Sequence, residues 1–333
     1  MPQGWDKDIP TFPADAKGTA TRESNNKVLN AVAKNVPWLI GGAADLAPST
    51  KTLIKDAGSF ERGEYSGRNF HFGIREHAMG AIVNGMCVSG VRAYGATFFI
   101  FSDYMRPTLR LAALMDLPAI FIYTHDSVGL GEDGPTHQPI EQLMSLRAMP
   151  RLMVFRPADA NEVSETWRYI MQLKHEPVAI ALSRQAMPTF DRTKYGSAAG
   201  VAKGAYVLAD CKGTPELILM GTGSEVQLCI GAYEKLSGDG AKVRVVSMPS
   251  WELFEKQTAE YRAEVLPPAV RARVAVEAGA TFGWKQYVGE DGEVVGRDDF
   301  GASAPIKDIM RHFGFTVDNV VAKARLTINK IKS

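Results

Sequence analysis

Short apolar runs alternate with amphipathic stretches along the first half of the chain. The runs are bounded by glycine or polar residues, which is typical of strands buried on both faces of a parallel sheet. Between them, apolar residues such as Met79, Val83 and Cys87 recur at helical spacing. The pattern predicts strands at 38–42, 69–73, 94–98, 119–123, 153–155 and 178–182, and helices at about 24–35, 75–88, 101–114 and 161–173. This alternation indicates a parallel sheet covered by helices on both faces.

A second alternating region follows a segment of different composition. Residues 185–201 are rich in Pro, Gly, Ser, Thr and charge and show no period, which favours a linker. Beyond them, strands are predicted at 217–220, 243–247 and 274–277, and helices at 225–236 and 317–331. We therefore predict an α/β fold of two consecutive domains, each a mostly parallel sheet flanked by helices. The domains span 12–190 and 203–333, with the linker at 191–202.

Composition and charge narrow the class of protein. A length of 333 residues with 45% hydrophobic residues suits two globular domains. The 38 Lys and Arg nearly cancel the 37 Asp and Glu, so no charge excess indicates a nucleic-acid or membrane partner. No apolar run reaches membrane-spanning length, and the first residues do not resemble a secretory signal. The cysteines Cys87, Cys211 and Cys229 form no CxxC pair, which favours reduced thiols and a cytoplasmic location.

The segment 124–139 is the strongest candidate for a site. It follows the apolar run 119–123 and contains two His, three acidic residues, three Gly and two Pro. Loops that leave the carboxyl ends of parallel strands are where open α/β sheets bind ligands. Glycine lets the backbone approach a ligand closely, and proline fixes the path of the loop. We therefore interpret this segment as a binding or catalytic loop.

Two glycine-rich segments resemble nucleotide or metal motifs but have simpler interpretations. The segment Gly221-Thr222-Gly223-Ser224-Glu225-Val226 lacks the last glycine of a dinucleotide fingerprint, so we interpret it as a strand-to-helix turn with Ser224 as N-cap. Ser24 is the predicted N-cap of the helix at 24–35. The segment 238–240, Gly-Asp-Gly, reads as a polar turn.

Residue spacing alone leaves two further features open. Phe98, Phe101 and Tyr104 recur every three residues, so spacing favours core packing, although aromatic residues at a strand end can also stack on a flat heterocycle. Glu76 opens a helix, where a carboxylate favours the helix dipole. A buried carboxyl with a raised pKa could equally bond a ligand nitrogen. Both interpretations of Glu76 stand.

Several segments, in the same order along the chain, closely resemble transketolase, a thiamine-diphosphate enzyme of sugar-phosphate metabolism. The matching segments are 41–49, 74–79, 123–139, 182–185, 276–279 and 315–320. The resemblance covers the family's pyrimidine-binding and C-terminal domains. It implies that the N-terminal domain, which holds Mg²⁺ and the cofactor's diphosphate through a Gly-Asp-Gly…Asn element, is absent. Thiamine diphosphate is then the cofactor, with only its pyrimidine part bound by this chain and with no metal ligand here.

The resemblance also assigns roles to individual residues. It implies that Glu76 bonds the aminopyrimidine N1′ and that Phe98, Phe101 and Tyr104 form the aromatic wall around the ring, which replaces the core interpretation. The implied catalytic residues are Glu76, Asp133 and His137, and the implied substrate-binding residues are Arg22, Asp45, Ser49, His125, Asp133, His137 and Arg184. Guanidinium groups suit a sugar phosphate because they bind its oxygens in pairs. The C-terminal domain is expected to serve dimer contacts and architecture.

The implied reaction moves a two-carbon ketol unit from a ketose phosphate to an aldose phosphate. The implied partners are sugar phosphates, a diphosphate-binding subunit or domain, and a second copy in a homodimer or heterotetramer. The isolated chain is expected to be inactive. Alternatives are a β-type subunit of a 2-oxoacid dehydrogenase, a dihydroxyacetone synthase, and a non-catalytic assembly subunit or truncated chain.

Overall fold

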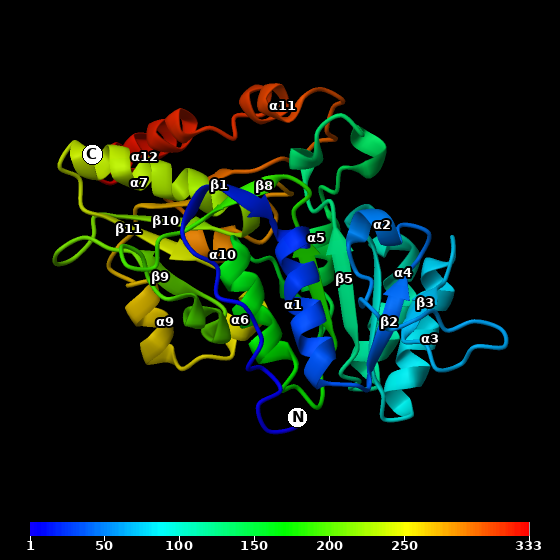
Figure 1. The fold of residues 1–333 in the computed structure, drawn as a ribbon. Helices are drawn as coiled ribbons and strands as arrows, with labels where there is room; N and C mark the ends of the chain where they lie inside the picture. The colour runs from blue at the N-terminus through cyan, green and yellow to red at the C-terminus, as the bar shows by residue number, and fades with distance from the viewer. Residues whose placement is uncertain (333) are drawn as a thin grey trace.

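Two large sheets lie side by side in the protein, each with its own helices (Figure 1). The structure, a computed structural model, describes residues 1–332. The strands of one sheet lie between residues 39 and 182, and the strands of the other lie between residues 206 and 295. This arrangement agrees with the α/β fold class predicted from the alternating pattern, in which each sheet is mostly parallel and flanked by helices.

The first sheet has six strands, and every neighbouring pair in it is parallel. In spatial order the strands are β3 (Asn69–His71), β2 (Leu39–Ala43), β4 (Arg92–Phe98), β5 (Ile120–Thr124), β7 (Val178–Leu182) and β6 (Met153–Phe155). Each lies within or next to a predicted strand. Because the strands are parallel, their carboxyl ends meet at one edge, and the loops that follow them lie together.

Helices cover both faces of this sheet, as predicted. Alternate residues of a strand point to opposite faces. Ile120 and Ile122 of β5 therefore pack with α1 (Thr21–Asn35) and α6 (Ala160–Ile170). Phe121 and Tyr123 pack on the other side, with α3 (Glu76–Val88) and α4 (Ser102–Leu114).

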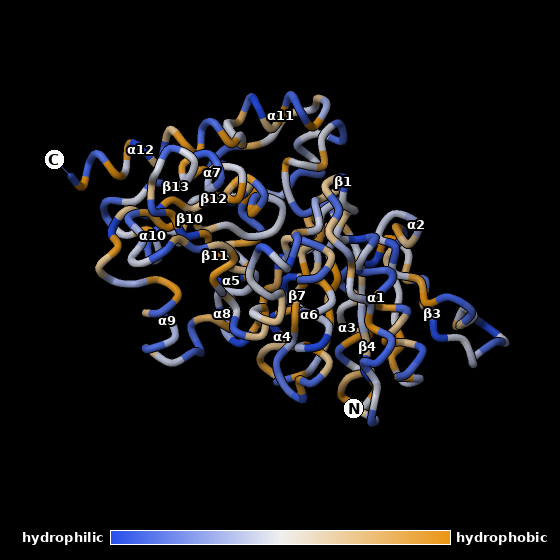
Figure 2. Tube along the Cα trace, turned by 60° about the vertical axis from the view of Figure 1, so that its left-hand side comes forward, coloured by the Kyte–Doolittle hydropathy of each residue, from blue (hydrophilic) through white to orange (hydrophobic). Residues whose placement is uncertain are grey.

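The second sheet has five strands, of which one is antiparallel. In spatial order these are β13 (Glu293–Val295), β12 (Arg273–Val276), β10 (Leu217–Gly221), β11 (Val243–Ser247) and β9 (Tyr206–Ala209), with β9 antiparallel to β11. One face packs on α7 (Val226–Gly238) and α12 (Val317–Lys332). The other face packs on α8 (Trp251–Glu255), α9 (Ala259–Val265) and α10 (Lys285–Val288). Hydrophobic positions follow the strands of both sheets (Figure 2).

The remaining elements are short and lie mainly in loops. They are α2 (Ala47–Thr50), α5 (Gln142–Arg147), α11 (Ile306–His312) and the 3₁₀ turns η1 (Phe99–Phe101), η2 (Val128–Leu130), η3 (Pro135–His137), η4 (Ala198–Lys203) and η5 (Gly223–Glu225). Several of these turns lie in the loops that leave β4, β5 and β10, so irregular backbone is concentrated at the strand ends.

Three local predictions were wrong. The segment 185–201 contains a strand, β8 (Ala186–Thr189), which pairs with the polar, largely exposed β1 (Asp15–Ala20) in a separate antiparallel ribbon. Neither strand alternates polar and apolar residues cleanly, so the pattern did not reveal them. Ser24 is not an N-cap, because α1 begins at Thr21 and the buried Ser24 hydroxyl donates to the Thr21 carbonyl. The third error is the predicted N-cap at Ser224, whose side chain instead bonds a charged residue at the boundary between the two halves.

Candidate active site

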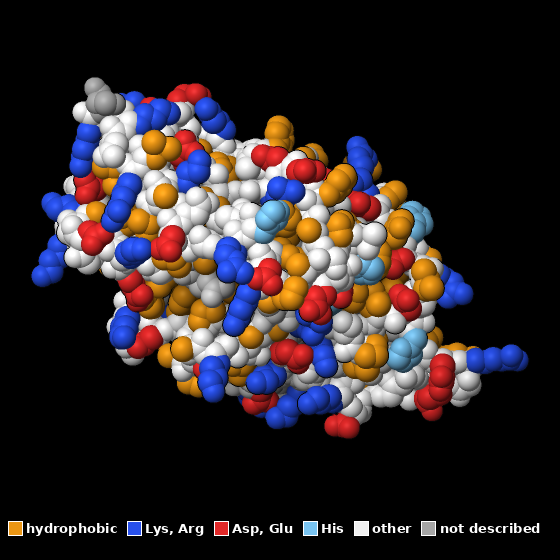
Figure 3. Space-filling view, turned by 90° about the horizontal axis from the view of Figure 1, so that it is seen from above, with side chains coloured by type: hydrophobic (Ala, Val, Ile, Leu, Met, Phe, Trp, Pro, Cys, Tyr) orange, Lys and Arg blue, Asp and Glu red, His pale blue; other side chains and the backbone are white. Residues whose placement is uncertain are grey.

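Most of the residues predicted to form a site lie at the carboxyl edge of the six-stranded sheet. They are Asp45 and Ser49 after β2, Glu76 after β3, Phe98 and Phe101 at the end of β4, His125, Asp133 and His137 after β5, and Arg184 after β7. Arg22 joins them from the first turn of α1. Seen from above, this side of the molecule presents histidine side chains among hydrophobic, acidic and basic ones (Figure 3).

Glu76 is the first residue of α3 and is 6% exposed. Its carboxylate accepts a long hydrogen bond of 3.5 Å from Thr97 Oγ1, and residues 1–332 supply no second hydrogen bond to it. A carboxylate at this position is favoured by the helix dipole. Since each carboxylate oxygen has two lone pairs, Glu76 also keeps the capacity to bond a ligand beside the sheet edge.

His125 lies at the centre of the cluster. It is 2% exposed, has a positive φ of 62°, and its Nδ1 lies 2.9 Å from Thr124 Oγ1. Burial, together with the positive charges of Arg22 and Arg184 and the nearby His137, lowers the pKa of His125 to about 3. The imidazole is therefore neutral at physiological pH and acts as a hydrogen-bonding group, not as a cation.

An aromatic surface extends from His125 along the start of α4. The Phe98 ring lies 3.7 Å from the His125 ring, centroid to centroid, and 6.0 Å from the Phe101 ring in a stacked arrangement. His137 meets Phe101 edge-on at 5.7 Å. Tyr104 stacks on Phe101 at 5.8 Å but is 63% exposed, so it forms the outer end of this surface. The predicted aromatic group is therefore contiguous, and its first ring, Phe98, approaches both His125 and His137.

Two arginines flank the buried histidine. Arg22 Nη1 donates to the Ser49 carbonyl at 3.0 Å and to the Ser49 hydroxyl at 3.2 Å. Burial lowers the pKa of Arg22, Arg184 lowers it further, and Asp133 opposes that shift, which places the three charges in one electrostatic neighbourhood. Arg184 is exposed and donates to the Leu130 carbonyl at 3.5 Å. Arg22 Nε is buried and has no partner in the described part of the chain.

Asp133 and His137 occupy the loop after β5 without direct contact to a buried charge. Asp133 is exposed, and His137 is half-buried with its Nδ1 2.9 Å from Thr136 Oγ1. Asp45 is also exposed, in the turn before α2. The structure thus joins Arg22, Ser49 and His125 closely, while Asp45 and Tyr104 lie at the periphery.

A second charged cluster lies between the two halves, and its extent could not be predicted from local sequence patterns. Arg156, directly after β6, is fully buried and pairs with Asp126 at 2.8 Å and with Glu225. Its own burial would lower the pKa of Arg156, but Glu225 and Asp126 outweigh this and raise it. Ser224 accepts from Arg156 Nη2 at 3.2 Å and donates to Glu225, so it is not the predicted N-cap. The one available signal was a charged residue ending an apolar strand.

Arg147 continues this cluster on the five-stranded sheet. It forms two hydrogen bonds, of 2.8 and 2.9 Å, with the carboxylate of the buried Glu277. Glu277 also accepts from Thr222 Oγ1 and from Trp284 Nε1. Burial would raise the pKa of Glu277, but Arg147 and Arg156 outweigh it and lower that pKa. All charges here have partners within the protein, which indicates a structural cluster.

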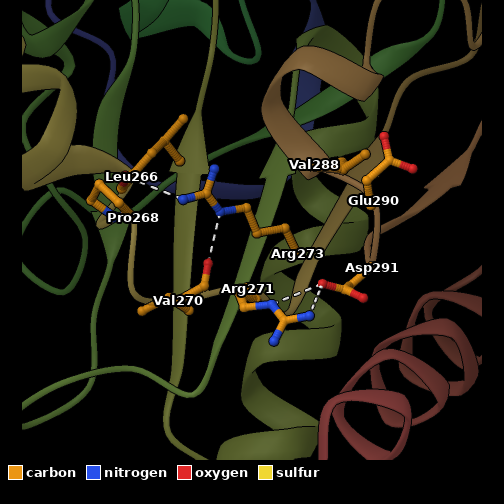
Figure 4. A pocket seen from close by; sticks show the side chains of 9 residues that line it. Leu266, Pro268, Val270, Arg271, Arg273, Val288, Glu290 and Asp291 are labelled. Carbon is orange, nitrogen blue, oxygen red and sulfur yellow. Dashed lines mark hydrogen bonds and ion pairs between the residues drawn. The ribbon is translucent and has the colours of Figure 1, made fainter.

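A separate hollow of about 600 Å³ lies at the amino end of β12 (Figure 4). Its two arginines are already bound within the protein, because Arg273 bonds the carbonyls of Val270, Tyr287 and Pro267 and Arg271 pairs with Asp291. No residue of the candidate site lines it. We therefore place the candidate chemistry at the edge of the six-stranded sheet.

The described residues contain neither a metal-binding cluster nor a membrane-spanning helix. Within residues 1–332, no group of three or more His, Cys, Asp or Glu side chains is arranged to hold a metal ion. No helix in the same range is both long and apolar enough to cross a bilayer. The three cysteines are free thiols, with Cys87 and Cys229 buried.

Fold and site together define a two-domain α/β protein with a candidate site for an anionic, ring-containing ligand at the edge of its first sheet. The family described as "Transketolase, pyrimidine binding domain" matches residues 17–189, and "Transketolase-like TK C-terminal domain" matches residues 204–316. The chain belongs to the transketolase family, as its sequence motifs indicated.

Individual relatives agree with this assignment. The transketolase of Halalkalibacterium halodurans is 55% identical over 326 residues, which are 98% of this chain and 49% of the relative. A solved transketolase from Pichia stipitis in complex with sedoheptulose 7-phosphate is 40% identical, with a TM-score of 0.94 over 99% of this chain and 49% of that one. The chain therefore spans about half the length of the curated relatives it matches.

One solved chain of similar extent is more distant. It is described as an inactive β4 tetramer of a split-gene transketolase, is 24% identical, and has a TM-score of 0.73 over 94% of this chain and 99% of that one. At this identity the likeness is one of fold alone.

Proposed function

We propose that this chain supplies the pyrimidine-binding and substrate-binding half of a transketolase. The reaction is transfer of a two-carbon ketol unit from a ketose phosphate to an aldose phosphate. The observation that carries the proposal is that Arg22, His125 and Arg184 lie together beside the aromatic surface, at the sheet edge that also holds Glu76. Cationic side chains that can bind a phosphate and aromatic rings that can stack on a heterocycle thus lie at the same sheet edge.

The residues present fit the pyrimidine part of thiamine diphosphate. Glu76 is a buried carboxyl group with one long hydrogen bond, so in its protonated form it can donate a hydrogen bond to a ring nitrogen. Phe98, which directly follows the Glu76 partner Thr97, and Phe101 offer a stacking surface, and Tyr104 closes its outer end. When bound, this cofactor supplies the carbon nucleophile of ketol transfer. The role we assign to Glu76 is to hold a proton in a hydrogen bond to the ring and thereby set its tautomer.

The substrate phosphate is proposed to bind Arg22, Ser49, His125 and Arg184. Arg22 and Ser49 are already joined, so they are pre-arranged for a shared ligand. Arg184 adds an exposed guanidinium, and the neutral His125 supplies a ring nitrogen without the cost of a buried charge. Asp45 precedes Ser49 and is assigned to the rim of this clamp.

Asp133 and His137 are assigned to the hydroxyl groups beside the reacting carbon. His137 lies edge-on to Phe101, which brings its imidazole to the border between the aromatic surface and the phosphate clamp. From there it can donate to or accept from a substrate oxygen, while Asp133 accepts from a hydroxyl.

The diphosphate and Mg²⁺ are assigned to a partner domain. The chain spans about half of its relatives, and its described residues contain no metal-binding group. The partner is a diphosphate-binding subunit or domain, and a second copy of the chain completes a homodimer or heterotetramer. Exposed apolar side chains on and near α3 and α4, such as Ile74, Ile82 and Leu111, support association through this face. The proposed location is the cytoplasm.

The phosphate clamp is tested by Arg184→Ala in enzyme reconstituted with a diphosphate-binding half. We expect KM for phosphorylated acceptors to rise about tenfold or more, with KM for a non-phosphorylated aldose nearly unchanged, since a contact remote from the reacting carbon acts through binding. Arg271→Ala, which removes an exposed arginine at the opposite end of a sheet, is the control and should change neither value. Equal KM changes for both acceptors in Arg184→Ala would rule out the clamp.

A further inference from the structure

One buried side chain closes the base of the loop that carries Asp133 and His137. Gln138 is 1% exposed, and its Nε2 donates to the Gly131 carbonyl at 2.9 Å. The same nitrogen donates to the Ala302 carbonyl at 2.9 Å, in the segment between β13 and α11. A single amide group therefore joins the two ends of the loop 131–138 and ties both to the C-terminal half.

The C-terminal segment 301–304 is shaped to receive this loop. Ser303 Oγ donates to the Glu132 carbonyl at 2.6 Å. Gly134 has a φ of 77°, and a Cβ there would lie 3.2 Å from Ser303 Cβ, so the two backbones approach closely. In Figure 1 the loop after β5 extends away from the sheet toward α11, and η2 packs on that helix.

The fit between Gln138 and Gly301 is especially close. A Cβ on residue 301 would lie 1.7 Å from Gln138 Oε1, so any larger residue would displace the amide. The same oxygen is buried and has no hydrogen-bond partner within residues 1–332, whereas the nitrogen uses both of its hydrogens. An amide is favoured at this position because its nitrogen can donate to both carbonyl oxygens. A carboxylate has no hydrogen to donate and would be repelled by them.

We propose that Gln138 is a positioning residue through which the C-terminal half sets the placement of Asp133 and His137. The brace consists of Gln138 and the segment 301–304, and it acts on the loop without touching substrate. Its consequence for substrate recognition rests on the proposed function, while the brace itself does not. The C-terminal half thereby takes part in the site, beyond the architectural role expected from the sequence.

Hydrogen exchange of the isolated chain tests the brace without any assumption about activity. Among residues 132–137, the hydrogen-bonded amides of Gly134 and His137 should exchange about tenfold or more faster in Gln138→Leu, because one to two buried hydrogen bonds no longer close the loop. Gln172→Leu is the matched control, since the side chain of the exposed Gln172 bonds only the Arg168 carbonyl of the preceding helix α6. Unchanged exchange at 132–137 in folded Gln138→Leu would overturn the proposal.

Two further variants keep the test decisive if Gln138→Leu does not fold. Gly301→Ala changes only the C-terminal half, yet its methyl group must push the amide, so exchange at 132–137 should rise there too. Gln138→Glu can donate only when protonated, so its loop protection, corrected for intrinsic rates, should recover as pH falls from 8 to 6. A structural role elsewhere would not produce that pH dependence. Unchanged exchange at 132–137 in Gly301→Ala, together with pH-independent protection in Gln138→Glu, would contradict the brace.

Kinetics of the reconstituted enzyme separates this proposal from the proposed function. Gln138→Leu should raise KM for hydroxylated sugar phosphates several-fold more than it raises KM for glycolaldehyde phosphate, which offers fewer hydroxyls to Asp133 and His137. Equal changes, together with faster loop exchange, would refute the link from brace to substrate recognition. Failure of the unmodified enzyme to transfer a ketol unit would instead refute the proposed function.

Discussion

The carboxyl edges of the two sheets share one geometry and differ in what fills them. At the first edge, Glu76, His125 and Arg22 keep unused hydrogen-bonding capacity. At the second edge, guanidinium groups of Arg147 and Arg156, both from the first half, occupy the corresponding space. Parallel strand ends therefore offer a site wherever they occur, and side chains from a neighbouring unit decide whether the site stays open.

The glycine-rich turn after β10 illustrates this most directly. Gly223 has a φ of 52°, and a Cβ on it would lie 2.7 Å from the Arg156 guanidinium. The space that a nucleotide phosphate would take beside such a turn therefore holds an internal cation, balanced by Glu225. The two edges are also linked, because Arg156 binds Asp126, the residue directly after His125.

We expect the largest effect, a loss of turnover, from a substitution at the carboxyl edge of the first sheet, which we call the open edge. Glu76→Gln in the reconstituted enzyme should lower turnover by roughly 10²–10⁴-fold, the usual loss on removing a positioned acid or base. Stability should change little, because the residue has one weak hydrogen bond. Steady-state kinetics beside thermal melts measures both. If turnover falls less than tenfold and the melting temperature drops, Glu76 serves only as a charge that stabilises the helix end.

At the carboxyl edge of the second sheet, which Arg147 and Arg156 fill, we expect a substitution to lower the free energy of unfolding. Arg156→Met leaves the Asp126 and Glu225 carboxylates buried without their partner, which typically costs about 3–5 kcal/mol. Urea denaturation measures the free energy of unfolding. Arg156→Met combined with Glu225→Gln should recover part of the loss, because one buried charge is gone. Additive losses in the double variant would show that the two residues do not act as a pair.

Features set by interactions between residues that are near in the sequence can be predicted from it. Features set by residues that are far apart in the sequence cannot. The strand of Ile120 and Ile122 and the helix of Met79 and Val83 are set by local periodicity, and the structure has both. The role of Ser224 is set by Arg156, which lies far away in the sequence, so a local capping rule could not predict it. The site residues came from family motifs, whereas their pairings, such as Arg22 with Ser49, required the fold.

A smaller effect should appear in the pH dependence of stability. Because the folded-state pKa of His125 is lowered to about 3, the unfolded chain binds the proton more readily below about pH 6.5. The contribution of His125 to the free energy of unfolding is therefore fully present above that pH. It falls as the pH drops, by up to about 1.4 kcal/mol per pH unit. Denaturation at pH 7, 6 and 5 measures the slope. His125→Gln should flatten it, and a control at the exposed His312, His312→Gln, should not.

The central claim is that the open edge is half of a catalytic site. Its most direct test is ketol transfer by the purified chain with thiamine diphosphate, Mg²⁺ and a ketose and aldose phosphate pair, alone and with the N-terminal half of the Halalkalibacterium halodurans relative. We expect negligible turnover alone, because the charged diphosphate anchor is assigned to the partner, and robust turnover on mixing. Robust turnover by the chain alone, or none on mixing when both halves are folded and associated, would contradict the account.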